Sequence, residues 1–256
     1  MIDLHAHILP GVDDGARTLA DAREMARVAA AEGVRAIAAT PHVRRDHPTS
    51  AEAMERGVET LREDFRAEGI DVEVLPGGEL DLEWIESLDP GELRRYALGG
   101  GRHLLLEVPY HGWPRGLEAR IARLRQEGLA AVLAHPERNE TVREQPEWLA
   151  GLRAEGALVQ VTAASLDGRL GRRTQAAARR LVQLGLVDVL ASDAHHPELR
   201  AYGLVAAAAA LRDPGLARHL TVDVPAAVVA GEEITPETRG RRQRFALGRL
   251  RNTLPW

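Results

Sequence analysis

Short apolar runs alternate with helical patterns along the chain. A short apolar run that is followed by a polar turn is typical of a buried strand, whereas apolar positions three and four apart predict a helix. Strands are predicted near Met1–Ala6, Val34–Ala39, Val72–Leu75, Arg102–Glu107, Leu129–Ala134, Ala157–Thr162 and Val187–Ser192. Helices are predicted over Thr18–Glu32, Ser50–Glu68, Trp113–Glu127, Pro146–Glu155, Ser165–Leu184 and Pro197–Arg212. This alternation predicts an α/β fold with a parallel sheet.

Glycine stands just beyond the end of several predicted helices, at Gly33, Gly69, Gly128, Gly156 and Gly185. Glycine readily adopts the left-handed conformation that ends a helix, so each of these positions indicates a junction between a helix and the next strand. The pattern fits an open doubly wound sheet and a closed barrel equally well. The position of the polar residues has to decide between them.

Residues that can bind metal stand at the carboxyl ends of six of the seven predicted strands. His5 and His7 are two residues apart, so they face the same side of the first strand. The strand near Gln160 offers no obvious ligand. Because active sites of α/β barrels assemble at this end, the pattern favours a barrel. The candidate ligands are His5, His7, Asp14, His42, Glu79, Glu107, His135, Asp193 and His195.

This donor set predicts a centre with more than one metal ion. A single histidine after a strand is usually structural, but chance does not explain agreement at six strand ends. Imidazole and carboxylate ligands without thiolate suit Mn, Fe or Zn. The candidate ligands exceed what one ion needs, so we expect two or three ions that share bridging carboxylates.

Composition removes several kinds of chemistry. The 256 residues include no cysteine and no lysine, because all 33 basic residues are arginine. Thiolate nucleophiles, disulfides, lysine Schiff bases and a carbamylated lysine bridge are therefore excluded. The net charge of −5 gives no general case for nucleic-acid binding. No apolar run is long enough to span a bilayer and the start does not read as a signal peptide, so we expect a cytoplasmic protein.

Two arginines follow candidate ligands closely. Arg138 is three residues beyond His135, and Arg200 is five residues beyond His195. A guanidinium at the mouth of a metal site can hold phosphate oxygens with paired hydrogen bonds. The alternative is a surface arginine paired with Glu137 or Glu198, and the spacing alone does not decide between the two.

The ordered motifs resemble those of the PHP (polymerase and histidinol phosphatase) superfamily. Within it, they are similar to the bacterial manganese-dependent protein-tyrosine phosphatases that accompany tyrosine kinases of capsule and exopolysaccharide synthesis. The resemblance runs from Met1 to about Ile234. The motifs are Asp3-x-His5-x-His7-Ile8-Leu9-Pro10-x-x-Asp13-Asp14-Gly15, Thr40-Pro41-His42, Gly78-Glu79, Leu106-Glu107, Ala134-His135-Pro136-Glu137-Arg138 and Ser192-Asp193-x-His195.

The resemblance implies a distorted seven-stranded barrel, the PHP fold, with three divalent metal ions, Mn before Fe or Zn. The first ion would be bound by His5, His7, Glu79 and Asp193, the second by Glu79, Glu107 and His135, and the third by Asp14, His42 and His195. Asp14, Arg138 and Arg200 are the implied catalytic residues, and the two arginines would hold the phosphate. Metal-bound hydroxide would attack the phosphorus of phosphotyrosine on a protein.

The C-terminal segment departs from the family. We expect a phosphatase domain over residues 1–234 and an Arg-rich tail over residues 235–256, which contains six arginines. The tail either packs on the barrel or on a neighbouring subunit, or contacts an anionic surface such as a membrane. Relatives form rings of subunits, so a homo-oligomer is expected from the resemblance alone.

Other functions remain open at this point. The same fold can hydrolyse a small phosphoester such as histidinol phosphate, or a nucleic-acid 3′ end. An amidohydrolase would need Glu79 in the place of the usual bridging lysine. A metal-binding regulator without catalysis is the fourth alternative, although every ligand position is filled.

Overall fold

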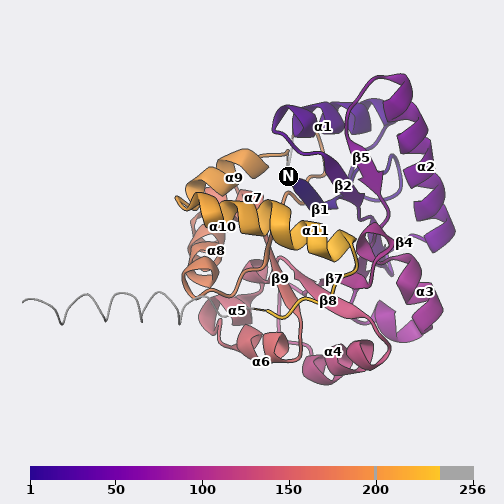
Figure 1. Ribbon diagram of the computed structural model, residues 1–256. Helices are drawn as coiled ribbons and strands as arrows, with labels where there is room; N and C mark the ends of the chain where they lie inside the picture. Colours follow the sequence, from indigo (N-terminus) through magenta and orange to yellow (C-terminus); the bar gives the residue numbers. More distant parts are fainter. Residues whose placement is uncertain (199–200, 237–256) are drawn as a thin grey trace, which may run out of the picture.

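The structure, a computed structural model, describes residues 1–198 and 201–236 (Figure 1). Its strands are β1 (Ile2–Ala6), β2 (Ala36–Ala39), β3 (His42–Arg44), β4 (His47–Pro48), β5 (Glu73–Leu75), β6 (Glu79–Asp81), β7 (His103–Glu107), β8 (Ala130–Ala134), β9 (Leu158–Thr162) and β10 (Val189–Ala191). All seven predicted strands are present, and β3, β4 and β6 are additional. Pro41 separates β2 from β3, and Pro76 lies between β5 and β6. Proline lacks an N–H, so it cannot continue a strand ladder on both sides.

The strands close into a distorted barrel. One sheet has the order β1-β2-β5 and the other the order β10-β9-β8-β7-β6-β3-β4, with every pair parallel except β3 and β4. The chain passes directly from β2 to β3 and from β5 to β6, which joins the sheets on one side. On the other side Asp193 N donates to His5 O at 2.8 Å and His7 N donates to Ala194 O at 2.8 Å. The expected barrel is thereby confirmed.

Helices surround the barrel: α1 (Leu19–Ala31), α2 (Ala51–Ala67), α3 (Pro90–Arg95), α4 (Leu117–Gln126), α5 (Glu140–Glu144), α6 (Trp148–Ala154), α7 (Ala163–Asp167), α8 (Arg172–Gln183), α9 (Leu204–Ala210), α10 (Pro214–Arg218) and α11 (Val224–Val229). The Thr18 side chain caps the start of α1. The predicted helix over Ser165–Leu184 is two helices, because Gly168 and Gly171 adopt positive φ between them. The glycines predicted to stop helices all have positive φ.

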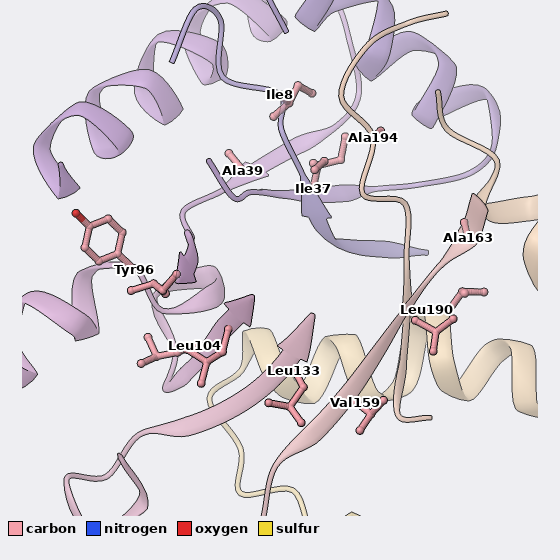
Figure 2. Packing of buried hydrophobic residues seen from close by; sticks show 14 of the residues in the cluster. Ile8, Ile37, Ala39, Tyr96, Leu104, Leu133, Val159, Ala163, Leu190 and Ala194 are labelled. Atoms are coloured by element: carbon pink, nitrogen blue, oxygen red, sulfur yellow. The ribbon is translucent and has the colours of Figure 1, made fainter. Parts of the chain in front are cut away.

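Alternate strand residues pack on opposite faces of the barrel wall. One cluster of buried side chains joins the strands to the outer helices. From four neighbouring strands it includes Leu104, Leu133, Val159 and Leu190 (Figure 2). A second cluster contains residues of the other strand face and is covered by α11, which contributes Val224 and Val228. Figure 1 shows α11 crossing the strands. The second face therefore fills the barrel interior.

No described helix is long and apolar enough to cross a membrane.

Two of the predictions concern residues that the structure does not describe. Arg200 and residues 237–256 lie outside the described residues, which leaves the role of the Arg-rich tail a prediction.

A buried ion pair anchors α6 to the barrel. Arg153 of α6 donates to Asp188 Oδ2, which also accepts from Val159 N at 2.9 Å, and both side chains are buried. Removing one partner of a buried pair leaves the other charge desolvated. We expect Asp188→Ala to lower the free energy of unfolding by about 3–5 kcal/mol, measured by urea denaturation.

The matched control is Asp71→Ala. Asp71 pairs with Arg35, but its side chain is 91% exposed. Exposed ion pairs contribute about 0–1 kcal/mol, so this variant should unfold nearly as wild type does. Equal, small losses in both variants would contradict the assigned role of the buried pair.

Candidate metal centre

The structure brings all nine candidate ligands together at the carboxyl ends of the strands. His5 is the last residue but one of β1, His7 follows this strand, and His135 follows β8. His42 and Glu79 lie just beyond β2 and β5, as the first residues of β3 and β6. The ligand atoms form four overlapping groups, each within 4.8 Å: His7, Asp14, His42 and His195; His5, His7 and Asp193; His5, Glu79 and His135; His42, Glu79 and Glu107. Every group shares a member with another, so the set is one continuous centre.

Glu79 lies at the middle of this centre. Its Oε1 lies 2.7 Å from His135 Nε2, and its Oε2 lies 2.9 Å from His42 Nδ1, 3.3 Å from His7 Nε2 and 3.5 Å from His5 Nε2. The side chain is buried, and burial of a carboxylate is costly unless a cation compensates it. Among the described residues, Oε2 makes no hydrogen bond despite these neighbours. This oxygen is placed as a ligand atom would be, so the residues fit a metal centre.

The backbone is strained at two candidate ligands. His135 has a φ of 36° and Asp193 a φ of 52°, and Arg212 is the only other described non-glycine residue with positive φ. Such conformations cost about 1–3 kcal/mol and concentrate at functional sites. His135 follows β8 and Asp193 follows Ser192 after β10, and both side chains belong to the centre.

Two polar residues behind the ligands orient the imidazoles. Asp13 Oδ2 lies 2.7 Å from His7 Nδ1, and Gln160 Oε1 lies 3.0 Å from His5 Nδ1. An acceptor at Nδ1 holds the proton there and leaves Nε2 free to bind metal. Both Nε2 atoms point to the same place, 3.2 Å apart.

Asp14 comes from the loop that follows β1. Its Oδ1 lies 3.3 Å from His42 Nε2 and 3.4 Å from His195 Nε2, and its side chain is 47% exposed. Gly15 packs so closely behind His7 that an added Cβ would lie 2.1 Å from the His7 carbonyl oxygen. The loop therefore fits only with glycine at this position, and it holds Asp14 at the mouth of the centre.

The carboxylates bias the imidazoles towards their charged forms. Burial lowers the pKa of His7, but Asp13 and Glu79 outweigh it and raise this pKa to about 10. Burial likewise opposes a raised pKa at His42, which Asp14 and Glu79 bring to about 9. Burial and the Arg138 cation instead lower the pKa of His135 to about 4. Because ligating imidazoles must be neutral, metal binding here competes with protons.

The remaining carboxylates respond to the same neighbours. His5 and His135 hold the pKa of Glu79 well below its ordinary range, although its burial acts in the opposite direction. Hydrogen bonds from His195 and His42 lower the pKa of Asp14. Burial and the adjacent Glu79 charge raise the pKa of Glu107. The centre therefore keeps the Glu79 and Asp14 carboxylates ionised beside imidazoles that a divalent cation would replace as the source of positive charge.

Arg138 reaches the centre. Its Nη2 donates to Asp193 Oδ2 and, at 3.1 Å, to Thr162 Oγ1. Glu137 instead accepts from Thr162 N and Ser165 Oγ, so it does not hold Arg138 on the surface in a hydrogen-bonded pair. The structure thereby places this guanidinium beside a candidate ligand.

Sequence reasoning missed two residues of the centre. Gln160 was set aside with its strand, although a buried amide inside the apolar run of β9 was a signal. Arg44 donates from Nη1 to both oxygens of Glu107, at 3.3 and 3.2 Å. No spacing rule pointed to Arg44, because its contact depends on the pairing of β3, β6 and β7.

Comparison with known proteins gives a consistent result. The family model for capsular polysaccharide synthesis, CpsB/CapC, matches residues 1–228. Tyrosine-protein phosphatase YwqE of Bacillus subtilis is 38% identical over 204 residues, which cover 78% of this chain and 79% of that protein. Tyrosine-protein phosphatase CpsB of Streptococcus pneumoniae is 25% identical over 248 residues, which cover 91% and 100% respectively.

The fold comparison agrees. This chain matches a solved structure with a TM-score of 0.83 at 32% identity. That structure belongs to a set of YwqE from Bacillus subtilis and CpsB from Streptococcus pneumoniae, which are described as unique metal-dependent tyrosine phosphatases. The match covers 93% of this chain and 98% of that one. The family model, which matches residues 1–228, includes every strand that carries a candidate ligand.

Replacing Asp13 tests how the centre is oriented. Asp13→Ala removes the acceptor at His7 Nδ1, and loss of such a partner typically costs 10–100-fold in metal affinity. We expect a loss of about that size in the Mn²⁺ dissociation constant, measured by chelator competition. Asp71→Ala is the control and should bind as wild type does. Unchanged affinity in Asp13→Ala would show that His7 needs no such support.

Proposed function

Because the chain belongs to the CpsB/CapC family of capsular polysaccharide synthesis, we propose that it is a metal-dependent tyrosine-protein phosphatase. The observation that carries this proposal is the continuous buried centre around Glu79, with the Arg138 guanidinium at its edge. Clustered imidazoles and carboxylates bind divalent metal, and a guanidinium fork binds phosphate oxygens. Together they fit phosphoryl transfer to water.

The centre is proposed to hold three divalent ions, with Mn preferred and Fe or Zn as alternatives. One set of ligands is His5, His7, Glu79 and Asp193, the second is Glu79, Glu107 and His135, and the third is Asp14, His42 and His195. The groups of ligand atoms within 4.8 Å support parts of this division: His5 lies with His7 and Asp193, and Asp14 lies with His42 and His195. Glu79 belongs to two groups, one with His135 and one with Glu107, so it is the residue that two ions would share. When bound, such ions supply a nucleophile at neutral pH and neutralise charge on phosphoryl oxygens.

The protein's own residues bind and orient the substrate. Arg138 is held through Nη2 by Asp193 and Thr162, and its Nε makes no hydrogen bond among the described residues. We propose that it binds the phosphate together with Arg200. The leaving group of phosphotyrosine is a phenolate with a pKa of about 10, so it needs less proton donation than an alkoxide. Asp14, ionised because its pKa is lowered, serves at the mouth as a ligand rather than a proton donor.

The proposed substrate is a phosphotyrosine protein, specifically a bacterial tyrosine kinase of capsule or exopolysaccharide synthesis. Support comes from the names of the relatives and from the net charge of −5, which does not favour nucleic acid. We place the enzyme in the cytoplasm, with a phosphatase domain over residues 1–234. Contact of residues 235–256 with a membrane surface, and assembly into a homo-oligomer, are further parts of this proposal.

A substrate comparison tests the proposal. The Mn²⁺-loaded protein should release phosphate from a phosphotyrosine peptide with a kcat/KM at least about 100-fold above that for histidinol phosphate or the matching phosphoserine peptide. Arg138→Ala should lower kcat/KM on the phosphotyrosine peptide by about 100-fold, because a charge-stabilising donor is lost. Its metal content, measured by elemental analysis, should stay at the wild-type value.

Two results would contradict the proposal. Faster turnover of histidinol phosphate would assign the centre to a small phosphoester. Loss of metal in Arg138→Ala would show that this residue supports the centre rather than binding phosphate.

A further inference from the structure

A groove of about 420 Å³ opens beside the metal centre. It is lined by Tyr110, His111, Arg138, Arg143, Leu170 and Thr174. Arg138 lines the groove and is also hydrogen-bonded to Asp193 in the centre. The groove is therefore continuous with the place where the phosphate is proposed to bind.

Tyr110 forms a preorganised aromatic wall of the groove. Its side chain is 47% exposed, yet its loop is held firmly. Asn139 Nδ2 donates to Pro109 O and Gly112 O, both at 2.7 Å, and Glu140 N donates to Tyr110 O at 3.0 Å. A large aromatic ring on a fixed loop presents contact area to a ligand at low conformational cost.

The ring of Tyr110 is positioned next to the reacting end of the groove. Its hydroxyl accepts from Arg138 Nη1 at 3.4 Å, and its ring centroid lies 6.1 Å from that of His135. Leu170, in the break between α7 and α8, adds an apolar contact, and its N–H donates to Ala164 O at 3.0 Å. The groove thus combines the cations Arg138 and Arg143 with the aromatic and apolar surface of Tyr110 and Leu170.

We propose that this groove is the aryl subsite of the enzyme, in which the ring of phosphotyrosine packs against Tyr110 and Leu170. The inference rests on the proposed phosphatase function and names the residue that selects an aryl over an alkyl phosphoester. A phenolic ester joins its ring to phosphorus through one oxygen. A phosphate held by Arg138 therefore places the ring in the adjoining groove.

Binding of phosphonates tests the subsite without turnover. Calorimetry on the full-length, Mn²⁺-loaded protein compares phenylphosphonate with methylphosphonate, which share a head group and differ in the ring. The wild type should bind phenylphosphonate about tenfold more tightly, as expected for burial of a ring against an aromatic wall. Tyr110→Ala should abolish most of this preference. Tyr110→Phe should retain it, because the ring rather than the hydroxyl makes the contact.

Trp148→Ala is the matched control. Trp148 is the other large aromatic residue with high exposure among the described residues, at 43%, and it does not line the groove. Its replacement should leave the preference unchanged. Equal binding of the two phosphonates by wild type, or the wild-type preference in Tyr110→Ala, would overturn the subsite. Failure to hydrolyse phosphotyrosine peptides would instead count against the proposed function, and the two failures are read in different assays.

Discussion

The burial of the Glu79 carboxylate is the constraint on which the centre depends. A carboxylate removed from water is unstable unless positive charge surrounds it. Four imidazoles lie within 3.5 Å of its two oxygens. The attraction between these groups raises the pKa of His7 and His42 and lowers that of Glu79, whereas burial and Arg138 keep the pKa of His135 low. In the absence of metal, the raised pKa values of His7 and His42 favour protons on these imidazoles, which compensate the buried charge. Divalent ions provide it more completely, and this exchange links metal binding to the chemistry.

The barrel brings these ligand groups together at one end of its strands. Parallel strands end at the same edge, and the ligands stand on or just after them. The strands are not regular throughout, since the register of β1 against β2 shifts between Asp3 and Ala6, where the first ligands stand. The positive φ at His135 and Asp193 adds a second local departure. The strain at these positions is held by the close-packed wall beneath, of which Leu133 and Leu190 are part.

Much of this arrangement could be predicted from the sequence. Each predicted apolar run is a strand in the structure. At six of the seven, a His, Asp or Glu at or just beyond the end of the run predicted the position of a ligand. The additional strands β3 and β6 were not predicted, because each is only three residues long and follows a proline, Pro41 or Pro76, beyond the end of a predicted strand. Gln160 did carry a signal, as an amide inside the apolar run of β9, whereas Arg44 carried none, because its contact with Glu107 depends on which strands pair. Such long-range geometry has no local signal.

The most direct test of the account is whether phosphatase activity follows metal. Protein stripped by a chelator should hydrolyse p-nitrophenyl phosphate only after Mn²⁺ is added, and activity should rise with the measured metal content. Protein shown to contain metal that remains inactive with Mn²⁺, Fe²⁺, Co²⁺ and Zn²⁺ would contradict the account. Full activity in the metal-free protein would contradict it equally.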